Sequence, residues 1–215
     1  MTRYLGEGIA RHLGRATGLN AEDMEVVAYG LEYLLSAGLG ILLTLLAAFL
    51  LGLLPETLAL LACWILVRRL AGGAHCSTLW RCAAGSCFSA IAAVLISLFA
   101  AKSVPVYLWA GAATIWALWA TWRWAPNNSK KPVRDPVRRK LLRRRALMVE
   151  LFLGVAFLLL SLNNSEMLRK MAAAGGGGIA SAALMISPAG LFIVNKFDNF
   201  CNFLLTLFNK EVKMQ

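Results

Sequence analysis

The sequence predicts an all-α polytopic membrane protein with about six transmembrane helices, amphipathic N- and C-terminal helices, and both termini in the cytoplasm. Its composition is the first indication. Of the 215 residues, 59% are hydrophobic and 15% are charged, whereas soluble domains are about 25% charged. The second indication is a net charge of +11 carried by a chain whose mean hydropathy is +0.65. Strongly basic chains are usually polar and bind nucleic acid, so the position of the positive charge decides between the two interpretations.

Six apolar stretches are long enough, or nearly so, for a helix to cross the hydrocarbon core, which needs about 20 residues. In chain order they cover residues 34–54, 57–71, 82–101, 104–122, 147–162 and 171–192. The third and fourth are separated by a break at which Pro105 is suited to open a helix. The second is short. The sixth contains four consecutive glycines at 175–178, which predict an unusually loose helix.

The basic residues predict the orientation, because short cytoplasmic loops collect Lys and Arg. With an internal N-terminus and six spans, only Lys102, Arg169 and Lys170 face outside, so 19 of the 22 basic residues lie on the cytoplasmic side. The densest group is a basic cytoplasmic loop at residues 123–146. This distribution favours an even number of spans. Topology and contact with anionic lipid therefore explain the charge, and we expect no nucleic-acid partner.

The two ends of the chain are predicted to lie on the inner membrane surface. In residues 2–18, apolar side chains recur at intervals of four and arginines fall elsewhere around the helix, as in an amphipathic interfacial helix. Residues 193–209 form a similar amphipathic tail. Simple anchoring is sufficient to explain both. We expect residues 1–215 to form a single membrane domain.

The segment RRLAGGAHCSTLWRC, residues 68–82, is predicted to be a catalytic cytoplasmic loop. A cysteine attacks as its thiolate, which an imidazole, a positive charge or a helix N-terminus stabilises. Ser77 or Thr78 is a suitable N-cap for the third span, and this places Cys82 in the first turn. His75 would then be the general base.

A dyad of these two residues requires that the chain turn between them. In one continuous helix, a separation of seven residues is about 10 Å along the axis. Gly72 and Gly73 supply a hinge, since glycine tolerates conformations that other residues avoid. The competing interpretation is a packing cysteine and a solvated histidine.

Two further alternatives concern the second thiol of the loop. His75, Cys76 and Cys82 offer three zinc ligands, but they lack the paired spacing of known zinc sites. We therefore expect no metal and no other cofactor. Cys76 itself would compete for acylation or merely pack, and it lacks a helix terminus behind it.

These residues resemble the signature of the accessory gene regulator protein B (AgrB) family, integral membrane cysteine endopeptidases of bacterial peptide quorum sensing. In that family an Arg and an AGGxH run precede the nucleophilic Cys, which follows the His by seven residues. Three further segments resemble the family in the expected order: AYGLEYLL at 28–35, WAPNNSKKPVR at 124–134 and ISPAGLFIVNKFD at 186–198.

The resemblance implies an enzyme that cleaves the C-terminal part from a quorum-sensing precursor peptide. The acyl group is held as a thioester until an internal Cys of the peptide takes it, which yields a thiolactone autoinducer. By position, Cys82 is the nucleophile, His75 its base, and Arg68 and Gly73 support activity. The resemblance also implies a bacterial cell-membrane protein, a cytoplasmic active site and a homodimer.

Four other residues carry hypotheses with open alternatives. Lys130, Lys131 and Arg134 of the basic loop are candidates to bind the acidic tail of the precursor, or they serve only topology and lipid contact. No carboxylate lies between Glu56 and Asp135 to orient His75. Glu32, at the inner end of the first span, is therefore a candidate for that role, or it pairs with an arginine.

A protein of another class remains the alternative function. A noncatalytic membrane scaffold or peptide exporter would have the same composition and topology. It would differ in one respect that is open to experiment, since His75 and Cys82 would then be replaceable.

Overall fold

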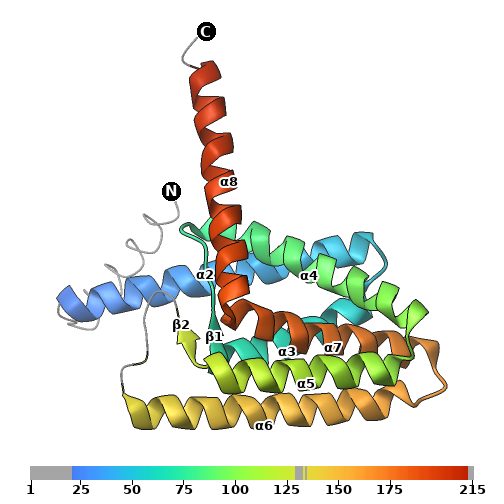
Figure 1. Cartoon of the computed structure of the whole chain (residues 1–215). Coiled ribbons are helices and arrows are strands. Elements are labelled where there is room, and N and C mark those ends of the chain that lie inside the picture. Colours follow the sequence, from blue (N-terminus) through green and yellow to red (C-terminus); the bar gives the residue numbers. More distant parts are fainter. Residues whose placement is uncertain (1–20, 129–132, 134, 213–215) are drawn as a thin grey trace.

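The computed structural model describes residues 21–128, 133 and 135–212, and within them the chain forms seven helices and two very short strands (Figure 1). The prediction of an all-α fold is confirmed. The elements are α2 (Ala21–Leu50), α3 (Leu54–Ala71), β1 (Gly72–Gly73), α4 (Leu79–Ser103), α5 (Val106–Trp124), β2 (Asn127–Asn128), α6 (Pro136–Ser161), α7 (Glu166–Ile186) and α8 (Pro188–Val212).

Helix α7 is the centre of the bundle and packs against α3, α4, α5 and α6. Its four glycines are all buried, and each lies against a different one of these helices. In order, Gly175–Gly178 face Phe157 of α6, Ala110 of α5, Ser97 of α4 and Leu60 of α3. Because glycine has no Cβ, four helices approach the α7 backbone closely. The prediction of a loose helix is therefore wrong.

The sixth apolar stretch is divided between two helices. Helix α7 ends at Ile186, and α8 begins at Pro188 after a bend of 80°. Proline lacks the amide hydrogen of the helical ladder and disfavours helix at the residue before it, so the break falls at Ser187. The expected span of 171–192 is thus too long at its C-terminal end. The tail expected at 193–209 lies in α8, which projects away from the bundle (Figure 1).

Helix α6 begins earlier than the apolar pattern suggests. Asp135 is its N-cap and accepts a hydrogen bond of 2.9 Å from the amide of Val137, and Pro136 is the first helical residue. The second half of the basic segment 123–146 is therefore helical. The three candidate residues for binding the precursor tail, Lys130, Lys131 and Arg134, lie outside the described residues.

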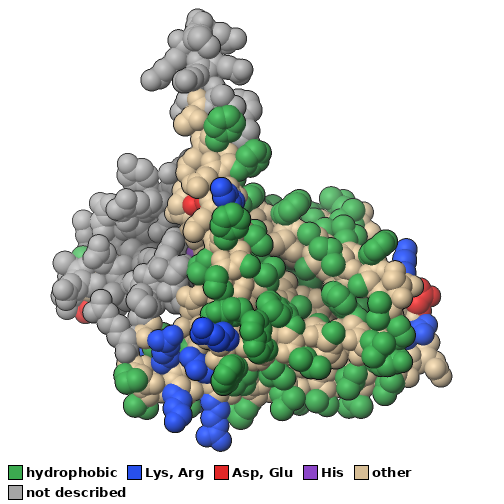
Figure 2. Space-filling model, in the orientation of Figure 1, with side chains coloured by type: hydrophobic (Ala, Val, Ile, Leu, Met, Phe, Trp, Pro, Cys, Tyr) green, Lys and Arg blue, Asp and Glu red, His purple; other side chains and the backbone are tan. Residues whose placement is uncertain are grey.

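The outer surface of the bundle is strongly hydrophobic. Within the described residues, α4 by itself is long and apolar enough to cross a membrane, and α7 with α8 passes the same test as a bent pair. On the face shown in Figure 2, many hydrophobic side chains are exposed across the middle of the bundle, while Lys and Arg lie towards its ends. An exposed apolar surface of this extent is typical of contact with lipid. Six spans remain a prediction, as does the placement of the termini, which lie outside the described residues together with the helix expected at 2–18.

Candidate active site

The loop between α3 and α4 turns at Gly72 and Gly73, as the sequence predicts. Their φ angles are +80° and +149°, in the region that favours glycine. The two residues form β1, which pairs in parallel with β2. The amide of Ala74 then donates a 3.0 Å hydrogen bond to the carbonyl oxygen of Met185 at the end of α7. The loop is thus held in an extended conformation against two other parts of the chain.

This turn brings His75 back to the first turn of α4. Thr78 is the N-cap residue, although its side chain makes no capping hydrogen bond, and the Cys82 amide donates to the Thr78 carbonyl oxygen at 3.0 Å. The Cys82 Sγ atom lies 3.8 Å from His75 Nδ1. Both side chains are half-buried. The separation is hydrogen-bonding distance for sulfur and is far shorter than the ~10 Å expected within one helix.

Cys76 is the second thiol beside this pair. It is buried, and a hydrogen bond to Cys82, followed by burial, raises the pKa of the Cys76 thiol. Cys76 therefore keeps its proton at neutral pH and donates it towards the Cys82 sulfur. Only a thiolate is a strong nucleophile, so this environment favours attack by Cys82 over attack by Cys76.

The guanidinium of Arg68 lies close to the backbone of Gly73. The Arg68 Nη2 atom donates a 2.7 Å hydrogen bond to the carbonyl oxygen of Ala74, and the guanidinium lies 5.2 Å from the centre of the Trp64 ring. A Cβ atom at position 73 would lie 3.0 Å from Arg68 Nη2. The absence of a side chain at Gly73 therefore leaves room for the arginine that holds the carbonyl before His75.

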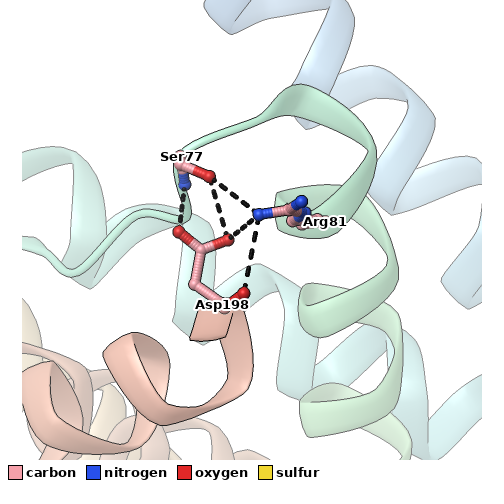
Figure 3. A network of polar contacts seen from close by, with 3 residues as sticks. All are labelled: Ser77, Arg81 and Asp198. Atoms are coloured by element: carbon pink, nitrogen blue, oxygen red, sulfur yellow. Dashed lines mark hydrogen bonds and ion pairs between the residues drawn. The ribbon is translucent and has the colours of Figure 1, made fainter. Parts of the chain in front are cut away.

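Asp198 of α8 contacts the same loop, and the sequence analysis missed it. Its carboxylate accepts hydrogen bonds from the Ser77 amide at 2.9 Å and the Ser77 hydroxyl at 3.0 Å, and it forms a 3.1 Å ion pair with Arg81 (Figure 3). The Arg81 and Asp198 side chains are only 13% and 16% exposed. Glu32 was the carboxylate predicted to act from a distance, whereas the carboxylate that contacts the loop comes from α8, 121 residues after Ser77. One signal was present, because residue 198 ends the segment 186–198 that resembles the family.

The side chains of the remaining candidates lie outside the described part of the structure. Glu32 lies on α2, and its side chain is not among the described ones. In the described part of the chain, no group of three or more His, Cys, Asp or Glu side chains is placed to hold a metal ion. His75, Cys76 and Cys82 therefore do not form such a group. The structure thus brings together His75, Cys82, Arg68 and Gly73.

Two of the segments that resemble the family in sequence, 124–134 and 186–198, also meet in space beside this loop. Asn127 of β2 donates through Nδ2 to the carbonyl oxygen of Ile186 at 2.8 Å, so the segments 124–134 and 186–198 are bonded to each other beside β1. Arg143 of α6 donates through Nε to the carbonyl oxygen of Ala125 at 2.7 Å. Three distant parts of the chain therefore support one loop.

Comparison with known proteins identifies the family. The chain matches the model of the family described as accessory gene regulator B over residues 7–186. It gives no significant match to a curated protein or to a solved structure. The match covers most of the chain and includes the loop and all of α2–α7. The chain therefore belongs to the accessory gene regulator B family, membrane-associated proteins that process an autoinducer precursor peptide in quorum sensing.

Proposed function

We propose that this protein is a membrane cysteine endopeptidase that cleaves the precursor through an acyl-enzyme thioester on Cys82 and releases the product as a thiolactone. The observation that carries the proposal is the 3.8 Å separation between Cys82 Sγ and His75 Nδ1 at the start of a helix. A nucleophile within hydrogen-bonding reach of a base is the arrangement that covalent catalysis requires. The helix N-terminus and the Cys76 thiol stabilise negative charge on the Cys82 sulfur.

The first half-reaction forms the thioester. His75 takes the Cys82 proton, and the sulfur attacks the carbonyl carbon of the scissile peptide bond. The tetrahedral intermediate collapses as His75 returns the proton to the leaving nitrogen. The C-terminal fragment leaves with a free amine, and the N-terminal fragment stays bound to Cys82.

The second half-reaction closes the ring. His75 takes the proton of an internal Cys thiol of the bound peptide, and that sulfur attacks the thioester carbonyl. Cys82 leaves as a thiolate and recovers the proton from His75. One thioester replaces another, so the exchange needs no nucleotide if water is kept from the intermediate.

The other predicted residues have supporting roles in this proposal. Arg68 and Gly73 hold the backbone before His75, Asp198 holds the backbone after it, and Glu32 is a candidate to contact the site from α2. Lys130, Lys131 and Arg134 would bind the acidic part of the precursor. Six spans, a cytoplasmic site, contact with anionic lipid and a homodimer belong to the same proposal.

The test is cleavage of the precursor by the full chain in lipid vesicles. We expect Cys82→Ala and His75→Ala to abolish cleavage and Cys87→Ala, a half-buried cysteine on the same helix, to leave it unchanged. Mass spectrometry of the wild-type protein should detect a peptide adduct on Cys82. Full cleavage by either dyad variant would contradict the proposal and favour a noncatalytic scaffold or exporter.

A further inference from the structure

A cavity of about 480 Å³ opens beside the candidate nucleophile. Cys82 and Cys76 lie in its wall, together with side chains from α3, α4, α5, α7 and α8. Its volume is within the range of about 300–1,000 Å³ that is typical of small-ligand sites. The proposed mechanism uses only the sulfur of Cys82, so this space has no role in it.

The wall of the cavity is apolar apart from Arg68 and four serines, and the Arg68 guanidinium donates a 2.7 Å hydrogen bond to the carbonyl oxygen of Ala74. Trp109, Trp116, Leu184 and Met185 contribute aromatic and aliphatic surface. The indole N–H of Trp109 donates to the carbonyl oxygen of Ala173 at 3.0 Å, so the hydrogen-bonding group of this side chain is already occupied. An apolar group would therefore be stabilised there, and a charged group would be destabilised by loss of hydration.

Three of the four serines that line the cavity also direct their hydroxyl groups to their own helices. Ser89 donates to the Gly85 carbonyl oxygen at 2.6 Å, and Ser97 donates to that of Ala93 at 2.6 Å. Ser181 donates to the Gly178 carbonyl oxygen at 3.1 Å. Their donor capacity is used within the helices, so they add little polarity to the cavity.

We propose that this cavity binds the side chain of the precursor residue whose carbonyl group acylates Cys82, and that it selects a large apolar residue there. The inference rests on the proposed function. An acyl group joined to Cys82 Sγ starts in the wall of the cavity, so its side chain is the substrate group nearest to the space. The same group stays attached from cleavage to ring closure, and a filled cavity would keep water from the thioester throughout.

Small residues set the size of the cavity. Ala92 on α4 and Ala180 on α7 are half-buried residues of its wall. A leucine at either position would fill part of the space, whereas Leu184→Ala would enlarge it. Ala62→Leu is the matched control, because Ala62 is exposed on α3 and is not among the residues of the wall.

The experiment compares precursors that differ only at the residue on the acyl side of the scissile bond, with Phe, Leu, Ala or Asn there. Each is cleaved by the full chain in phosphatidylcholine–phosphatidylglycerol vesicles, and kcat/KM is measured. We expect the wild type to favour Phe or Leu over Ala by about tenfold or more, as apolar pockets do for a few methylene groups. Ala180→Leu should remove most of this preference by slowing the Phe precursor, while Ala62→Leu retains it.

A second variant, Leu184→Ala, distinguishes a change in the cavity from misfolding of the protein. Leu184→Ala should shift the preference towards Trp at the same precursor position, which is a gain that an unfolded protein cannot show. If Ala180→Leu and Leu184→Ala each changed kcat/KM by the same factor for every precursor, the proposal would be overturned. Another occupant of the cavity, such as a lipid chain, would then be indicated. Failure of the wild type to cleave any precursor would instead overturn the proposed function.

Discussion

Asp198 on α8 accepts a 2.9 Å hydrogen bond from the backbone amide of Ser77, which lies between His75 and Cys82. The same carboxylate pairs with Arg81, the residue before Cys82 (Figure 3). One side chain of the tail helix thus holds the loop on one side and the start of α4 on the other. Both parts of the chain flank the candidate dyad, so α8 contacts the candidate site although it lies outside the central bundle.

Asp198→Asn should lower kcat for cleavage by about tenfold, because an amide replaces a charged acceptor and such a bond contributes about 1.5–3 kcal/mol. Weakening the contacts of Asp198 with Ser77 and Arg81 should misplace the base and the nucleophile but leave the contacts with the peptide intact. KM should therefore stay near its wild-type value. Asn199→Ala, an exposed neighbour on α8, is the control. Unchanged kcat in Asp198→Asn would show that the contact has no part in positioning the dyad.

Cys76→Ala should shift the acid limb of the pH profile of kcat/KM to higher pH. The Cys76 thiol, whose pKa is raised by its hydrogen bond to Cys82 and by burial, remains a donor across neutral pH and stabilises the Cys82 thiolate. Without this donor, a higher pH is needed to form the thiolate. Cys76→Ser keeps a donor and should retain a profile near that of the wild type. If the two variants give the same profile, the thiol only packs.

Gly73→Ala should reduce activity strongly, because two costs combine at this position. Its φ of +149° strains any residue with a Cβ atom, and that atom would lie 3.0 Å from Arg68 Nη2. The arginine would have to release the carbonyl of Ala74, which precedes His75. Gly38→Ala on α2, where a Cβ meets nothing within 4 Å, should be neutral. Rates of thioester formation for the two variants provide the comparison.

Gly177→Ala should destabilise the bundle by about 1–3 kcal/mol, the usual cost of overpacking. A Cβ at this position would collide with the hydroxyl of Ser97, which is fully buried. Removing that hydroxyl should relieve the collision, so Gly177→Ala combined with Ser97→Ala should recover much of the loss. Thermal unfolding in detergent micelles measures both. An additive double variant would mean that the two residues do not meet.

Lys130→Gln together with Lys131→Gln should weaken precursor binding at low salt, by about thirtyfold if each charge contributes ~1 kcal/mol near an acidic partner. The difference from the wild type should shrink as salt rises, because exposed charges are screened. Lys102→Gln, which removes one positive charge at the opposite end of α4 from Cys82, is the control. The measurement is the affinity of labelled precursor for the protein in vesicles. Equal affinities of the double variant and the wild type at low salt would show that these lysines do not bind the precursor.

Local sequence information was sufficient for several parts of the structure. Runs of apolar residues located α2–α7 in order, since each helix must present an apolar surface to its surroundings. The pair Gly72 and Gly73 predicted the turn, and a polar N-cap at Ser77 or Thr78 predicted the start of α4, where Thr78 is the N-cap. These features depend on residues that are near each other in the chain, so the placement of Cys82 in a first helical turn and of His75 within its reach could be predicted.

The remaining features depend on contacts between distant residues, and only the tertiary structure decided them. The four glycines predicted a loose helix because the sequence does not show that four other helices pack against them. Asp198 was missed because its partner Ser77 lies 121 residues away. The cavity at Cys82 is formed by five helices. The sequence alone thus determined the candidate catalytic residues, whereas the packing of α7 and the return of α8 decided which side chains contact the candidate site, because such contacts have no local pattern.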